Sequence, residues 1–224
     1  MTSALILFLL FFLLFFISRT LTRSISGLIL EVTKRQKIAV YFLAFLFLPG
    51  TLIHEVAHYL MANLLFVPAG NMRLWPKIDG NHVRLGSVEI QTTDPFRRML
   101  IGFAPFLFGS TILFTLIYYI SIQDFPLFSM PLFGLGYAIF EIGNTMFSSR
   151  KDLEGVIEVV GAITILSILL YIAGIRLPDN FFYFLSSEKM ETIFQMGSTY
   201  ILIPIVLDVL IILFFNIAKR ALTK

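Results

Sequence analysis

The residues best suited to carry chemistry in this sequence are His54, Glu55 and His58, which form a His-Glu-x-x-His pattern. Two imidazoles four residues apart lie one turn apart on the same face of a helix, so they can bind a single metal ion. The glutamate between them can take a proton from a water molecule held at that metal. The pattern therefore predicts a catalytic metal centre.

This pattern lies inside apolar sequence, with residues 38–48 before it and 59–67 after it. Two histidines and a glutamate are costly to place in lipid, which favours a functional interpretation. The alternative is a polar cluster that joins two transmembrane helices by hydrogen bonds. Such a cluster rarely needs this spacing, so the metal centre is the preferred hypothesis.

Composition indicates a membrane protein. The chain of 224 residues is 58% hydrophobic and only 14% charged, and its mean hydropathy is +0.88. A soluble domain has about half apolar and about a quarter charged residues. The net charge of +3 is interpreted as loop charge facing anionic headgroups, with no nucleic-acid partner. Because the chain has no cysteine, a metal must take nitrogen and oxygen ligands.

The apolar runs predict an all-α polytopic membrane protein, with residues 1–224 as one domain. Its length and pattern fit about six transmembrane helices at roughly 20 residues each, at residues 4–17, 37–67, 97–120, 127–147, 156–175 and 192–217. Residues 18–37 are expected to be a polar connection, and Pro49 and Gly50 to kink the second span.

Residues 68–94 form the longest polar segment and predict a small membrane-associated β-hairpin region between spans two and three. Six spans place both termini on one face, which is expected to be the cytoplasmic one. The basic residues of the first connection, Arg19, Arg23, Lys34, Arg35 and Lys37, argue against that topology.

Two histidines do not complete a catalytic zinc site, which takes three protein ligands and leaves a position for water. His82 is interpreted as a solvated loop residue, so the third ligand is expected to be a carboxylate. The candidates are Asp152, Glu141, Glu154 and Glu158. Glu141 is the most deeply placed in an apolar run, and the cost of burying it there makes it a strong candidate.

A second pattern lies about a hundred residues downstream, where Asn144 and Asp152 are separated by eight positions. Together with His54-Glu55-Val56-Ala57-His58, it resembles the site-2 protease family of intramembrane metalloproteases over roughly residues 38–160. That family carries His-Glu-x-x-His on one core helix and Asn-x-x-Pro-x-x-x-x-Asp-Gly on another. The chain departs from the second motif at two positions, with Phe147 in place of proline and Leu153 in place of glycine, which indicates a divergent member.

The resemblance implies a zinc-dependent metalloendopeptidase that hydrolyses peptide bonds of membrane-spanning substrates. Zinc would be bound by His54, His58 and Asp152, with Glu55 activating the zinc-bound water and Asn144 contacting the substrate backbone. The strand region could offer an edge to an extended substrate or cap the site.

Three other hypotheses stay open at this point. The same polar residues could line the path of a metal-ion transporter or channel, although no inverted repeat is visible in the sequence. They could belong to a non-catalytic membrane scaffold. A membrane protease of the CAAX-processing type would require Glu141 as the third ligand.

Overall fold

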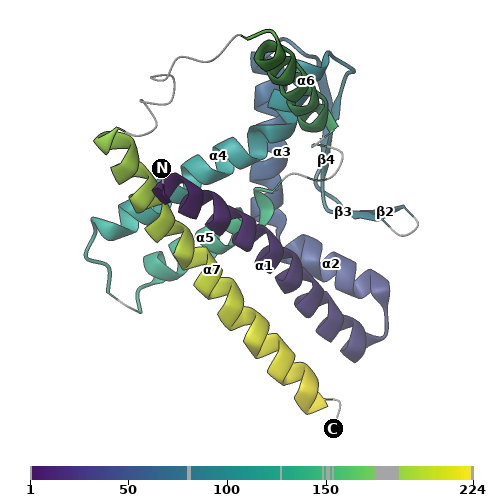
Figure 1. Ribbon diagram of the computed structural model, residues 1–224. Helices are drawn as coiled ribbons and strands as arrows, with labels where there is room; N and C mark the ends of the chain where they lie inside the picture. Colours follow the sequence, from purple (N-terminus) through teal and green to yellow (C-terminus); the bar gives the residue numbers. More distant parts are fainter. Residues whose placement is uncertain are drawn as a thin grey trace.

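The computed structural model describes residues 2–79, 82–126, 128–147, 149, 152, 154–174 and 187–222 (Figure 1). Its helices in this part of the chain are α1 (Thr2–Thr33), α2 (Gln36–Leu46), α3 (Leu48–Leu64), α4 (Pro95–Ser121), α5 (Met130–Thr145), α6 (Glu154–Ile172) and α7 (Glu188–Leu222). Its strands are β1 (Ala69–Arg73), β2 (Lys77–Asp79), β3 (His82–Arg84) and β4 (Ser87–Ile90).

Three helices, α1, α4 and α7, are long and apolar enough to cross a membrane by length and composition. The bent pair α2 and α3 would make a fourth if it forms one span, and α6 contains a shorter apolar segment. These helices agree with the predicted all-α membrane fold. The number of six spans stays a prediction.

Helix α1 overturns the expected polar connection at residues 18–37. It continues without a break through Arg19 and Arg23 as far as Thr33. Helix α7 packs along it, and the α1 side chains of Leu21 and Ile25 are buried in this second half. The polar residues were therefore misread as a loop, because tertiary packing buries one face of a helix that also carries charges.

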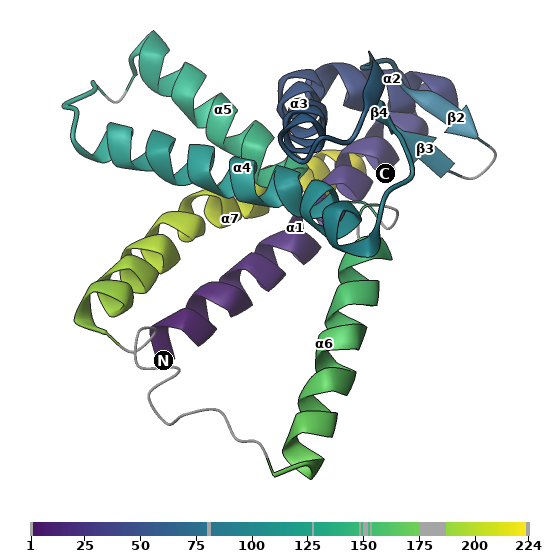
Figure 2. The same cartoon turned by 90° about the horizontal axis from the view of Figure 1, so that it is seen from above.

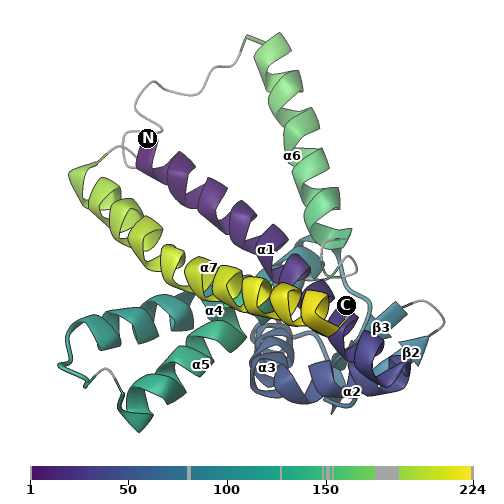
Figure 3. The ribbon, with the colours of Figure 1, turned by 90° about the horizontal axis from the view of Figure 1, so that it is seen from below.

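Helices α1 and α7 form a parallel pair. The hydroxyl of Ser3 donates to the carboxylate of Glu191 at one end, and Glu31 pairs with Lys219 at 3.2 Å at the other. The N- and C-termini of the chain consequently lie at opposite ends of this pair (Figures 1 and 3).

The predicted kink of the second apolar segment is a sharp bend of 70° between α2 and α3. The break falls at Phe47, two residues before the predicted Pro49. Pro49 lies in the first turn of α3, where its missing N–H costs no helical hydrogen bond. The bend therefore starts a new helix, which carries His54, Glu55 and His58.

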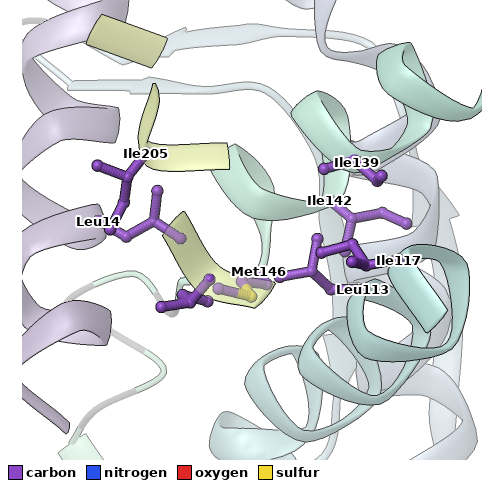
Figure 4. Close-up of a cluster of buried hydrophobic side chains, with 8 residues drawn as sticks. Leu14, Leu113, Ile117, Ile139, Ile142, Met146 and Ile205 are labelled. Atoms are coloured by element: carbon purple, nitrogen blue, oxygen red, sulfur yellow. The ribbon is translucent and has the colours of Figure 1, made fainter. Parts of the chain in front are cut away.

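The main hydrophobic core lies where α1, α4, α5 and α7 meet (Figure 4). Its buried side chains are Leu14, Leu113, Ile117, Ile139, Ile142, Met146, Ile201 and Ile205. Glycines allow these helices to approach closely: a Cβ at Gly109 would overlap the Met146 side chain, and one at Gly143 would lie 3.1 Å from Pro204 Cβ.

The polar segment after α3 folds into two small antiparallel sheets, β1 with β4 and β2 with β3. The predicted hairpin region is therefore present, with more strands than the two expected. Strand β4 lies beside α3 (Figure 2). The chain then enters α4 at Asp94, whose carboxylate accepts a hydrogen bond from the Arg97 amide, and this bond lowers the pKa of Asp94.

We expect Gly109→Ala to destabilise the protein by about 1–3 kcal/mol, because the new methyl group would force α4 away from Met146. Gly136→Ala on α5 is the matched control, since no atom lies within 4 Å of the added Cβ. Thermal unfolding in detergent measures both. Equal unfolding temperatures for the two variants would contradict the close contact.

Candidate metal centre

His54, His58 and Asp152 come together into one group that can hold a metal ion. Their ligand atoms all lie within 4.8 Å of one another. The two Nε2 atoms are 3.2 Å apart, and the Asp152 carboxylate lies 3.9 Å from His54 Nε2 and 3.7 Å from His58 Nε2. Ligands bound tetrahedrally at 2.0–2.1 Å are separated by about 3.3 Å. The two histidine nitrogens match this separation, and the carboxylate oxygens lie about half an ångström farther away.

Each imidazole ring is fixed by a hydrogen bond from its other nitrogen. His54 Nδ1 lies 2.7 Å from the carbonyl oxygen of Thr145, and His58 Nδ1 lies 2.8 Å from that of Ile101. A carbonyl only accepts, so both Nδ1 atoms carry the proton and both Nε2 atoms of the neutral rings present lone pairs. Two lone pairs directed at each other across 3.2 Å repel unless a cation lies between them.

The carbonyl that orients His58 is free because of a proline. In an α-helix the Ile101 carbonyl would accept from the N–H of residue 105. That residue is Pro105, inside α4, and proline has no N–H. The unused carbonyl is thus available to the His58 ring, and Pro105 four residues downstream was the sequence signal for it.

The carbonyl that orients His54 is free for a different reason. Thr145 is the last residue of α5, and the final carbonyls of a helix have no intrahelical partner. One of them accepts the proton of His54 Nδ1. Nothing in the sequence pattern pointed to Thr145, because its role depends on where α5 ends.

Asp152 is held in the connection between α5 and α6. Its carboxylate accepts a hydrogen bond of 2.7 Å from the backbone N–H of Ser149. Its backbone carbonyl lies against Gly102, where any Cβ would overlap it. Because Gly102 follows Ile101, one turn of α4 positions both His58 and Asp152.

Glu55 is buried on α3, between the two histidines in sequence and beside β4. Its carboxylate interacts with the backbone amide of Val88, and a Cβ at Gly86 would lie 2.9 Å from its Oε1 atom. Gly86 therefore lets the strand approach Glu55 closely. The strand, His58 and Asp152 all lie near this carboxylate.

The other sequence candidates lie elsewhere. Glu141 is not in the metal-capable group and instead accepts a hydrogen bond from Gly50 N–H. Glu158 pairs with Arg98, and the side chain of Glu154 lies outside the described residues. As for His82, only its backbone in β3 is described.

The amide nitrogen of Asn144 has hydrogen-bond partners within the protein. That nitrogen donates to the carbonyl of Phe140 and, at 2.8 Å, to the carboxylate of Asp208 on α7. Asp208 is fully buried, and sequence reasoning missed it although it is an acidic residue in an apolar run. The predicted substrate contact of Asn144 stays a prediction.

Comparison of the chain with protein-family models, with curated proteins and with solved structures finds no match. The chemistry open to the centre therefore follows from its own residues. Two neutral imidazoles and one carboxylate form a nitrogen and oxygen donor set, with a further carboxylate next to them on the same helix.

We expect Asp152→Ala to weaken metal binding by at least about 10–100-fold. Loss of a residue that only orients a metal ligand already costs that much affinity. Glu158→Ala is the control, because it removes a nearby carboxylate that is paired with Arg98 and is not in the metal-capable group. Calorimetric titration with Zn2+ measures both variants. Undiminished affinity in Asp152→Ala would show that the third ligand is another residue.

Proposed function

We propose that this chain is an intramembrane zinc metalloprotease that hydrolyses peptide bonds of membrane-spanning substrates. The observation that carries the proposal is the pair of histidine rings, oriented by two carbonyls so that both Nε2 atoms face the same point beside the Asp152 carboxylate. The motifs that resemble the site-2 protease family support the same function. The long apolar helices support a membrane location.

Zinc suits the donor set of His54, His58 and Asp152, because two imidazole nitrogens and a carboxylate are typical ligands of its catalytic sites. When bound, the metal supplies Lewis-acid polarisation of the scissile carbonyl and acidifies water. The chain itself fixes the ligands, since Thr145, Ile101 and Ser149 each hydrogen-bond one of them.

Glu55 is the proposed general base and acid. It lies on the same helix as both histidines and is buried, and its carboxylate can take the proton of the attacking water. It then passes that proton to the leaving amide nitrogen as the peptide bond breaks. The Val88 amide and the close backbone of Gly86 hold this carboxylate in place.

Strand β4 is the proposed binding site for the substrate backbone. Within the described residues it pairs only with β1, so its other edge has no strand partner there, and it lies beside α3. A hollow of about 580 Å3 adjoins the two strands and is lined by residues that include Arg73 and Trp75. An extended strand exposes carbonyls that a helical substrate would hide.

The parallel pair of α1 and α7 supports a topology that differs from the predicted one. If both helices cross the bilayer, the two termini lie on opposite faces, in place of the expected shared cytoplasmic face. Basic residues gather at the C-terminal end of the pair, namely Lys34, Arg35, Lys37, Lys219 and Arg220. That face is therefore the cytoplasmic one. The basic residues that conflicted with the six-span topology support this arrangement.

We expect Glu55→Gln to retain zinc and to lose about 10²–10⁴-fold in proteolysis, since the amide cannot accept the proton. Purified protein in nanodiscs is assayed with a single-span substrate while bound zinc is measured separately. A variant that cleaves normally would exclude Glu55 as the base. If the protein carries zinc into proteoliposomes and Glu55→Gln changes that flux, the chain is a transporter instead.

We expect a cysteine at Thr2 to react with a membrane-impermeant thiol reagent from outside the cell, and one at Ala221 only after permeabilisation. The natural chain has no cysteine, so each variant, Thr2→Cys and Ala221→Cys, has a single target. Labelling of both from one face would instead support an even number of spans.

A further inference from the structure

The bend between α2 and α3 breaks a backbone hydrogen bond. Its donor and its acceptor each form a hydrogen bond with a side chain of α5 instead. In a continuous helix, Gly50 N–H would donate to the carbonyl of Leu46. Here Gly50 N–H donates to Glu141 Oε2 at 3.0 Å, and the Leu46 carbonyl accepts from the Tyr137 hydroxyl at 2.8 Å. Side chains of α5 thus satisfy both the donor and the acceptor of this broken hydrogen bond.

A third contact between α5 and α3 lies at the metal centre, in line with these two. Tyr137, Glu141 and Thr145 are spaced four residues apart and share one face of α5. They meet residues 46, 50 and 54, and each pair is 91 positions apart in sequence. The third contact is the hydrogen bond between Thr145 and His54. We call these three hydrogen bonds the α5 ladder.

The ladder is closely packed at its centre. Glu141 is 1% exposed, and a Cβ at Gly50 would lie 2.8 Å from the Glu141 carbonyl oxygen. Phe47, the N-cap of α3, offers no side-chain hydrogen bond to the first turn. The Glu141 carboxylate supplies that cap from another helix, where the N-terminal end of α3 favours a negative charge.

We propose that Tyr137 and Glu141 are positioning residues, which replace the hydrogen bond lost at the bend and so set the direction of the helix carrying His54, Glu55 and His58. The proposal rests on the function proposed above. An error in the bend angle would displace both imidazoles and the Glu55 carboxylate together, because they lie on one rigid helix. Displacements on the order of an ångström in such groups cost about a hundredfold in rate.

The first experiment measures the bend without requiring a metal or a substrate. Spin labels are attached in the full-length protein at the exposed positions Phe42 on α2 and Leu64 on α3, through Phe42→Cys and Leu64→Cys. Double electron–electron resonance then reports the distance across the bend. We expect a single narrow distribution for the parent and for Glu141→Gln, which keeps an acceptor for Gly50 N–H.

We expect Glu141→Leu to broaden or shift that distribution, and Tyr137→Phe to do so to a smaller extent. Ile139→Ala is the control for general loss of stability, because Ile139 is a buried α5 side chain of the core that takes no part in the α5 ladder. It should unfold at a lower temperature and keep the parental distance. An unchanged distance in Glu141→Leu, or an equal change in Ile139→Ala, would overturn the proposal.

The second experiment uses Co2+ as a spectroscopic probe of the metal centre. Glu141→Leu should bind Co2+ about 10–100-fold more weakly and show an altered visible absorption band, with Glu141→Gln close to the parent. Parental Co2+ affinity and spectrum in Glu141→Leu would count against a positioning role. If the parent binds Co2+ but cleaves no peptide, the proposed protease function fails, and the bend distances still decide the role of Glu141.

Discussion

The candidate site depends on two backbone carbonyls that their own helices leave without a partner. Pro105 frees the carbonyl of Ile101, and the end of α5 frees that of Thr145. Each accepts the Nδ1 proton of one histidine, and this fixes the tautomer and orientation of both rings. In an apolar interior an unsatisfied carbonyl costs free energy. Each of the two hydrogen bonds therefore satisfies a backbone carbonyl and orients a candidate metal ligand.

Helix α5 contributes to the bend, the metal centre and the core at once. One face carries Tyr137, Glu141 and Thr145 toward α2 and α3, while Ile139 and Ile142 pack in the core with α1, α4 and α7. Its end leads directly into the connection that holds Asp152. A single short helix thus links the packing of the long helices to the geometry of the candidate ligands.

The sequence was informative wherever residue type and local spacing determine the result. His54 and His58 share a helical face at a spacing of four, and the apolar composition favours membrane helices. The role of Glu141 was not predictable, because a buried carboxylate in an apolar run suits a ligand as well as a helix cap. The continuity of α1 through Arg19 was missed because burial against α7 is not a local property.

Helices α1 and α7 are longer than a bilayer is thick. At about 1.5 Å per residue, the 32 residues of α1 extend roughly 48 Å, against about 30 Å of hydrocarbon. Tilting by up to about 40° does not remove the difference. If the pair crosses the bilayer, part of it extends beyond the hydrocarbon, and the basic end where Glu31 and Lys219 meet suits the headgroup region. Helix α2 packs against Leu21 and Ile25 in the same half of α1, and its Tyr41 ring lies beside that of Trp75. Aromatic side chains of this kind are enriched at the boundary between membrane and water.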